Sequence, residues 1–472
     1  MVQKLTSKLT LKAHVIFVTV ATVFGVFFVF AVPPFWGLDE SPHFARVYQI
    51  THGEMNLSRS PDAYFGYLPE NLQQLIDYSR KDLENNTTQA YGRKDVDSID
   101  GYRKLTSQKF SSYNNIPAYQ VANYLPIAYV GPIIGYQLSS SLDFNIGQTL
   151  TMARIFSLIT YISLVGLAIY ILKAHKLKWF IVVAGLLPTA LFNGSMVSAD
   201  TMLISLSFLL FAMFMKIIAN SGKQTDRRLF FAFLCVGAII PLIKVNYMLL
   251  SLGLLLALPI KNLFHRYGNT IKVAALLLII APASIWYLVS SGLGDPPSDS
   301  NLLPGGVSAS SQMSFVLHHP QGFLSAILRS IQLLSDSYVA TGSTIVGWNY
   351  ISVPTTISVI MCTIAFIVLI IGMKEFVYER RRLIIPVLFS LAGILSVFLA
   401  LYLAHSTVAL PYVNGVQGRY LIPFLLPIAA FMGTYLTIEI NQKQHERVII
   451  TALATLLIVL GWTALIFYAY TY

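Results

Sequence analysis

The chain has few charged residues and very few cysteines. Of its 472 residues, 11% are Asp, Glu, Lys or Arg, whereas an ordinary soluble domain has about 25%. This scarcity excludes a typical soluble protein. Both cysteines, Cys235 and Cys362, lie inside apolar runs. The sequence therefore gives no support to a disulfide framework, a thiolate nucleophile or a cysteine-based metal site.

The sequence also lacks the common motifs that bind nucleotides or metals. No Walker A loop, Rossmann glycine pattern, zinc-ligand spacing or nucleophile elbow occurs in a fitting structural context. The formal net charge is +11, but the basic residues are scattered between apolar segments and form no dense stripe. We therefore expect no nucleic-acid partner and look to the membrane to explain the charge.

Long apolar runs dominate the chain, which is 55% hydrophobic. Runs of roughly 18 to 24 residues match the length that crosses about 30 Å of hydrocarbon. We predict an all-α polytopic membrane protein, a single membrane domain over residues 1–472 with about eleven transmembrane helices. Residues 229–260 form either two short spans or one broken helix. The expected spans are 13–33, 149–172, 179–195, 199–219, 229–243, 246–260, 272–291, 352–373, 383–404, 419–438 and 448–470.

Basic residues in the connections predict the orientation. Six short connections carry nineteen of the thirty-two Lys and Arg residues, and the eleven-span arrangement puts all six on one side. That side should be the cytoplasm, with the amino terminus on it and the carboxyl terminus outside. The arrangement requires that Ala118 to Leu138 does not cross, so we expect a re-entrant or interfacial helix there. The six connections are 1–12, 173–178, 216–228, 261–272, 374–382 and 439–447.

Two large loops are then expected on the outer side. The first, 34–148, is hydrophilic and rich in tyrosine, and we predict a small folded cap with short interfacial helices. The second, 292–351, begins with an irregular Gly/Pro/Ser-rich stretch, Gly292 to Ser311. It continues as a short amphipathic helix from Phe323 to Leu334.

The start of the first outer loop is a rigid corner. Pro33 and Pro34 end the first span, which follows three lysines and lacks a clear cleavage site, so we expect it to be an uncleaved span. Ser41 as N-cap and Pro42 at the first helical position predict a new helix. The corner should therefore lie at the outer membrane surface.

Two adjacent carboxylates, Asp39 and Glu40, lie on this corner, and His43 follows one turn later. Such a pair is suited to three roles: a general base for an acceptor hydroxyl, ligation of a divalent cation, or a simple interfacial charge pair. His43 adds a hydrogen-bonding partner.

Four basic residues lie outside both the cytoplasmic connections and the first loop. Basic residues at the outer ends of spans are unfavourable without a specific reason, and four together suit a phosphate at headgroup level. Alternatively, each snorkels or pairs with a nearby acid such as Asp336 or Asp200. Asp200 heads an apolar helix, where it acts as a helix cap or a substrate contact. The four are Arg154, Lys244, Arg329 and Arg419.

Several of these segments together resemble one family. They are Leu38 to Phe44, Ser198 to Asp200, Lys244 with Asn246 and Tyr247, and Gln417 to Leu421. The chain resembles bacterial multi-spanning proteins catalogued as domain of unknown function number 2142, which are predicted to have the GT-C glycosyltransferase fold. GT-C enzymes move a sugar from a polyprenyl-phosphate carrier to an acceptor outside the cytoplasmic membrane. Their catalytic carboxylate lies just after the first span.

The resemblance implies roles for the candidate residues. Asp39, Glu40 and His43 would be catalytic, with the acid deprotonating the acceptor hydroxyl for an inverting displacement. The four cations would bind the donor phosphate. The expected partners are a polyprenyl-phosphate sugar, a glycopolymer acceptor and membrane lipids, at an extracytoplasmic site in the bacterial cytoplasmic membrane. We expect no cofactor or metal; a divalent cation at Asp39 and Glu40 is the alternative. Further substrate contacts would come from Asp200, Asn246, Gln417 and Tyr420.

Two other functions stay open. A transporter or flippase for lipid-linked saccharides would have ionisable residues near the bilayer midplane and broken helices in paired halves. A polysaccharide polymerase also has many spans and outward arginines, and the sequence separates it poorly from a glycosyltransferase. A non-catalytic scaffold remains the simplest alternative.

Overall fold

The computed structural model describes most of the chain. The described residues are 12–54, 58–60, 63–88, 96–111, 113–117, 121, 124–219, 227–290, 306–347, 354–372 and 380–471. Much of the predicted irregular stretch Gly292 to Ser311 lies outside these residues, as do the first eleven residues and most of the connection 374–382.

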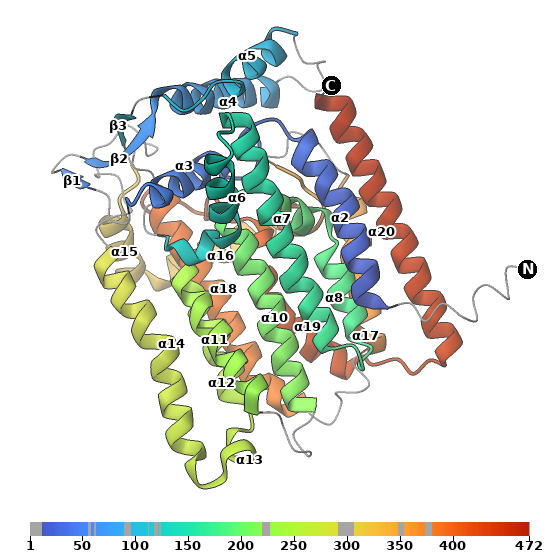
Figure 1. Ribbon diagram of the computed structural model, residues 1–472. Coiled ribbons are helices and arrows are strands. Elements are labelled where there is room, and N and C mark those ends of the chain that lie inside the picture. Colours follow the sequence, from blue (N-terminus) through green and yellow to red (C-terminus); the bar gives the residue numbers. More distant parts are fainter. Residues whose placement is uncertain are drawn as a thin grey trace, which may run out of the picture.

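The described part of the chain forms a bundle of roughly aligned helices with smaller elements at one end (Figure 1). Among the described residues, six segments are long and apolar enough to cross a membrane, and three shorter helices are also apolar. The chain is therefore a multi-pass membrane protein. The six are α2 (Ala13–Ala31), α7 (Ile146–Ile171), α10 (Ala199–Ala219), Ile260–Ser290 with α13 (Ile260–Phe264), η3 (His265–Tyr267) and α14 (Gly268–Ser290), Arg380–His405 with α18 (Ile384–His405), and α20 (Gln442–Thr471). The shorter ones are α12 (Met248–Ala257), preceded by η2 (Val245–Tyr247), α17 (Thr355–Gly372) and α19 (Ile422–Tyr435).

One predicted span is divided. The expected helix 179–195 consists of α8 (Lys178–Gly185) and α9 (Pro188–Ser195). The break falls at Leu187, whose extended backbone precedes Pro188 at the first position of α9. A residue before proline is driven away from helical geometry, and proline itself cannot donate to the preceding turn. A single continuous helix was therefore wrong for this segment.

The ambiguous region 229–260 forms two helices. α11 (Arg227–Ile243) ends just before Lys244, and η2 and α12 follow that residue. α11 and α12 pack against each other, and α11 also packs against α10 and α14. The turn between α11 and α12 thus places Lys244 at an end of the bundle.

The first predicted outer loop folds into helices and a small sheet at one end of the bundle (Figure 1). Strand β2 pairs antiparallel with β1 and with β3, in the order β1-β2-β3. The sheet was not predicted, because its strands are short and lack a clear apolar alternation. The elements are α3 (Glu40–Thr51), β1 (Ser58–Ser60), β2 (Ala63–Pro69), α4 (Glu70–Thr88), α5 (Val96–Thr106), β3 (Tyr113–Pro117), η1 (Pro126–Tyr129) and α6 (Val130–Ser141).

The stretch Ala118 to Leu138 does not contain a spanning helix among its described residues. Its helical part is η1 followed by α6, which has twelve residues. At 1.5 Å per residue α6 is about 18 Å long, well short of the hydrocarbon thickness. Pro126 begins η1, and α6 packs along α7. This agrees with an element that does not cross.

The second predicted outer loop contains two helices, α15 (Ala309–His318) and α16 (Pro320–Ser343). α16 is twice as long as the predicted helix from Phe323 to Leu334. It packs against α17 and against η5 (Gly418–Tyr420), so it joins the bundle.

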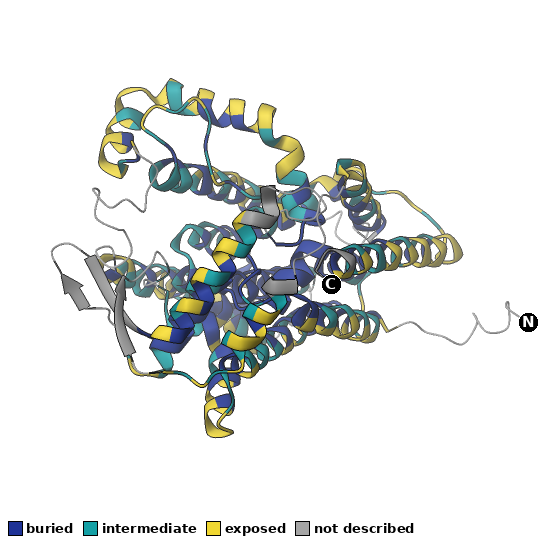
Figure 2. Cartoon of the chain, turned by 90° about the horizontal axis from the view of Figure 1, so that it is seen from above, coloured by how far each residue is buried: buried dark blue, intermediate teal, exposed yellow. Residues whose placement is uncertain are grey.

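Buried residues lie toward the middle of the bundle, and exposed residues lie along its outer helices (Figure 2). Most of the buried residues are apolar, and many large apolar side chains are exposed. α10 is the most enclosed of the six long helices, with 89% of its apolar window buried. Peripheral helices expose residues such as Leu288 and Ile458, as expected where lipid covers the surface. Cys235 and Cys362 are both free and exposed on α11 and α17.

Candidate active site beneath the first loop

A cavity of about 1140 Å³ lies where the first loop meets the helix bundle. Its walls come from α3 and α4 of the loop, the turn at Lys244, the end of α14, the start of α15 and the end of α18. Ala283, Trp286, Val397 and Leu401 supply apolar wall. Charged side chains that line the cavity include Asp39, Arg80, Asp200 and Lys244.

The corner after α2 is strained and firmly held. Phe35 and Asp39 have positive φ angles of 62° and 54°, which are uncommon outside glycine and concentrate at functional sites. α3 begins at Glu40, with Asp39 in the N-cap position. The predicted start at Ser41 was therefore wrong: the Glu40 backbone N–H already bonds to the Gly37 carbonyl at 3.3 Å, so the chain turns before Ser41.

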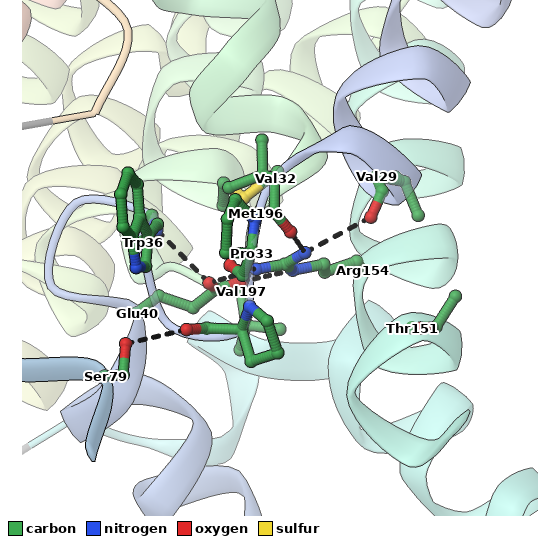
Figure 3. Close-up of polar contacts among 12 residues, drawn as sticks. Val29, Val32, Pro33, Trp36, Glu40, Ser79, Thr151, Arg154, Met196 and Val197 are labelled. Carbon is green, nitrogen blue, oxygen red and sulfur yellow. Dashed lines mark hydrogen bonds and ion pairs between the residues drawn. The ribbon is translucent and has the colours of Figure 1, made fainter. Parts of the chain in front are cut away.

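Glu40 and Arg154 form a buried two-pronged ion pair (Figure 3). Arg154 Nε donates to Glu40 Oε1 at 2.7 Å, and Nη2 donates to Oε2 at 2.6 Å. The backbone N–H groups of Gly37 and Val197 add bonds of 3.3 Å to the same carboxylate. The Glu40 side chain is 0% exposed. Both of its carboxylate oxygens therefore accept hydrogen bonds from protein groups only.

The remaining donors of Arg154 bind the end of α2. They reach the carbonyls of Val29 at 3.2 Å, Val32 at 2.6 Å and Pro33 at 2.9 Å. The last carbonyls of a helix have no partner within it, and the prolines that follow have no N–H. A cation is also favoured at a helix C-terminus. Arg154 thus joins α7, the end of α2 and the corner, with all five donors used.

The loop helices are tied to the same corner. Ser79 of α4 donates to the Pro34 carbonyl at 2.7 Å (Figure 3). Trp36 Nε1 donates to the Tyr102 hydroxyl of α5 at 2.9 Å. These bonds fix α4 and α5 against the corner that carries Asp39.

Asp39 turns toward the cavity and is backed by a buried arginine. Arg419 Nη2 donates to Asp39 Oδ2 at 2.8 Å. The Asp39 side chain is 37% exposed, whereas that of Arg419 is 2% exposed. Asp39 makes no capping bond to its own helix, so its carboxylate is oriented by Arg419 and accessible from the cavity.

The ion pair between Lys244 and Asp200 lies next to the Asp39–Arg419 pair. Lys244 Nζ donates to Asp200 Oδ1 at 2.6 Å, and Arg419 Nε lies 3.4 Å from Asp200 Oδ2. Asp200 lies in the first turn of α10, and its backbone N–H bonds to Ser198 Oγ at 3.1 Å. Asp39, Asp200 and Lys244 all line the cavity. The Lys244 side chain is 21% exposed, whereas that of Arg419 is 2% exposed and does not line the cavity.

The segment Gln417 to Tyr420 places Arg419 by a close backbone contact. A Cβ at Gly418 would overlap the carbonyl oxygen of Tyr338 on α16, so only glycine fits. Thr341 Oγ1 accepts the Gly418 N–H at 2.7 Å. The Tyr420 hydroxyl accepts from Arg419 Nη2 at 2.9 Å, and Gln417 and Tyr420 line the cavity.

His43 is buried beside the cavity and hydrogen-bonded to Tyr129, with 2.6 Å between His43 Nδ1 and Tyr129 Oη. Its ring stacks on that of Tyr124. Burial lowers the pKa of His43 to about 4, although Asp39 and Asp200 act in the opposite direction. The same burial raises the pKa of Tyr129. His43 is therefore neutral at pH 7 and is suited to hydrogen bonding, not to proton exchange near neutrality.

The structure brings together most, but not all, of the residues selected from the sequence. Arg329 is exposed on α16 and does not line the cavity. Arg154 and Glu40 are saturated by each other and by backbone groups. The residues at one end of the cavity are Asp39, His43, Asp200, Lys244, Asn246, Gln417, Arg419 and Tyr420, of which Arg419 lies behind Asp39.

Some contributors were missed in the sequence. Tyr124 stacks on His43 and lines the cavity. Arg46 is buried and donates to the backbone carbonyls of Tyr124 at 3.4 Å and Glu54 at 3.1 Å. A buried arginine requires partners, but nothing in the order of residues says which.

Among the described residues, no group of three His, Cys, Asp or Glu side chains lies close enough to hold a metal ion. Both oxygens of Glu40 are occupied by protein donors. The expectation of a metal-free site stays a prediction.

Comparison with known proteins adds one match. The model of a family described as "Predicted membrane protein (DUF2142)" matches residues 22–428. No curated protein and no solved structure matches the chain. The match covers the corner, the three ion pairs Glu40–Arg154, Asp39–Arg419 and Asp200–Lys244, and the segment that contains Arg419.

Proposed function

The chain belongs to the DUF2142 family of predicted membrane proteins, and from its cavity we propose that it is a glycosyltransferase that uses a polyprenyl-phosphate sugar. The observation that carries this proposal is the position of Asp39. It is an accessible carboxylate on a strained, fixed corner, and it faces a cavity that is lined by ion-paired charged side chains and by apolar residues. A lipid phosphate that carries a sugar has a phosphate that suits the charged lining and a lipid chain that suits the apolar lining.

In this proposal, the Lys244–Asp200 pair and the Asp39–Arg419 pair have different roles. Lys244 would hold the phosphate leaving group, since an ammonium donor next to a cavity is suited to an oxyanion. Asp39 would accept the proton of the attacking hydroxyl, and a general base must lie within hydrogen-bond reach of that proton. Arg419 would orient Asp39, and Tyr420 and Gln417 would contact the substrate.

The family resemblance implies that Glu40 is catalytic and that Arg154 binds the donor phosphate. We propose neither role for them. Their mutual bonds and full burial leave no donor or oxygen for a substrate. We propose that they position the corner instead. Arg329, exposed on α16, is left out of the donor site.

The location of the charged cluster supports a transferase more than a transporter. Asp200 lies in the first turn of α10, Lys244 lies in the turn after α11, and Arg419 lies just before α19. All three are therefore at helix ends next to the folded first loop. A transporter would favour ionisable residues near the middle of the bilayer.

The proposal requires that the first loop lie outside the cell. In a Cys235→Ala, Cys362→Ala background, a cysteine at exposed Lys104 of α5 should react with a membrane-impermeant maleimide in intact cells. A cysteine at exposed Lys261 of α13, at the opposite end of the bundle (Figure 1), should react only after permeabilisation. This follows from the bias of basic connections to the cytoplasm. The reverse pattern, or equal labelling, would contradict the orientation.

The proposed phosphate site predicts a loss of donor affinity when Lys244 is replaced. Lys244→Met combined with Asp200→Asn removes the cation without leaving a buried charge. It should weaken binding of undecaprenyl phosphate by about 1.5 to 3 kcal/mol, the contribution of a hydrogen bond to a charged group. Lys244→Arg should retain most of the affinity. Calorimetric titration of the purified chain in nanodiscs provides the measurement, and an unchanged dissociation constant in the double variant would remove Lys244 from the donor site.

A further inference from the structure

Part of the cavity is lined by α4, which the proposed chemistry does not use. Gln73, Ile76 and Arg80 line it, and their spacing of three and four residues puts them on one face of the helix. We propose that this face of α4 is the acceptor subsite and that it binds an anionic saccharide, one that bears a phosphate or a carboxylate. This inference rests on the proposed transferase function.

The first argument is the balance of charge around the cavity. Asp39 is paired with Arg419, and Asp200 with Lys244. Arg80 also lines the cavity, is exposed, and has no acidic partner in the described part of the chain. A guanidinium binds phosphate or carboxylate through two parallel hydrogen bonds. Because Arg80 forms no ion pair with Asp77 or Glu84, which lie one turn away on α4, its guanidinium is available to an oxyanion.

The second argument is an unused hydrogen-bond acceptor on the same face. Gln73 Nε2 donates to Asp77 Oδ1 at 3.0 Å, but Gln73 Oε1 is buried without a hydrogen-bond partner. Buried polar atoms are nearly always satisfied, and a sugar hydroxyl would supply the missing donor. Gln73 and Arg80 are about 10.5 Å apart along the helix axis at 1.5 Å per residue, so a ligand that meets both is elongated.

The third argument is that α4 is fixed relative to the proposed base. Ser79, the residue before Arg80, bonds to the Pro34 carbonyl of the corner at 2.7 Å. At the start of the helix, Asn71 Nδ2 donates to the Lys109 carbonyl at 2.6 Å, and Asn71 Oδ1 accepts from the Ser111 N–H at 3.1 Å. A site on a fixed helix binds with less loss of conformational entropy. An acceptor held along α4 would present its hydroxyl near Asp39.

Binding of three oligosaccharides of equal length tests the subsite: one neutral, one with a phosphate monoester and one with a uronate carboxylate. The full chain is placed in nanodiscs of zwitterionic lipid at low salt, because exposed charges are screened by salt. The wild type should bind at least one charged oligosaccharide about tenfold or more tightly than the neutral one. The two charged probes distinguish a phosphate-bearing from a carboxylate-bearing acceptor.

Arg80→Gln should abolish the preference for charge, and Arg80→Lys should restore part of it. Lys81→Gln is the matched control, because Lys81 is equally exposed on α4 but does not line the cavity; it should retain the preference. Equal binding of all three probes by the wild type, or a preference that survives Arg80→Gln, would overturn the subsite. Binding that depends on Arg80, in a protein that transfers no sugar from any polyprenyl-phosphate donor, would overturn the proposed function but leave the anion site intact.

Discussion

Replacing Asp39 with Asn is expected to lower sugar transfer by about 10² to 10⁴, the usual contribution of a general base. The amide keeps the shape of the side chain and can still accept the 2.8 Å hydrogen bond from Arg419, but it cannot take a proton from the acceptor. Donor binding should change little, since Lys244 and Asp200 are untouched. The measurement is the initial rate of transfer by purified protein, alongside the dissociation constant for undecaprenyl phosphate.

The pH dependence of this reaction follows from the same site. Because burial holds the pKa of His43 near 4, its ring stays uncharged between pH 5 and 8 and should cause no inflection near 6.5, the ordinary value for histidine. His43→Gln should therefore lower the rate without changing the shape of the pH profile in this range. An inflection near 6.5 that disappears in His43→Gln would assign the base to His43 instead of Asp39.

Breaking the Glu40–Arg154 pair is expected to have the largest effect on stability. Arg154→Ala would leave the buried Glu40 carboxylate without its cation and the carbonyls of Val29, Val32 and Pro33 without donors. Loss of one partner of a buried ion pair costs about 3 to 5 kcal/mol. Reversible unfolding in mixed micelles gives the free energy directly. Arg329→Ala is the matched control and should change it by less than about 0.5 kcal/mol, since Arg329 is exposed.

The double variant separates charge from packing. Glu40→Gln with Arg154→Met removes both charges, so its loss should be smaller than the sum of the two single losses by about 1 kcal/mol or more. Any single variant that still folds should also transfer sugar slowly, because the corner that carries Asp39 is loosened. Additive losses in unfolding free energy would show that the two residues do not act as a pair.

Much of the helical framework was predictable from apolar runs and caps alone. The predicted span 199–219 matches α10 residue for residue, because its ends coincide with a polar start and a basic finish. The boundary between α8 and α9 was missed although Pro188 marks it in the sequence. The run of apolar residues continues across that proline, so length alone predicted one helix.

The site could be predicted as a set of residues but not as a set of pairs. Charge at the predicted outer ends of spans pointed to Lys244 and Arg419, which the structure brings together at Asp200. The same signal selected Arg154, whose partner Glu40 lies 114 residues away, and Arg329, which faces outward. Sequence shows that a buried charge needs a partner, but only the fold shows whether that partner is protein or substrate.

The most direct test of the proposed activity is sugar transfer by the purified chain. Reconstituted protein is supplied with a panel of radiolabelled polyprenyl-phosphate monosaccharides and a bacterial glycopolymer fraction, and label in the polymer is counted. We expect the wild type and Lys81→Gln to transfer at least one sugar and to release free polyprenyl phosphate, and Asp39→Asn to transfer almost none. Movement of the intact lipid-linked sugar across the bilayer without release of polyprenyl phosphate would identify a transporter and contradict the account.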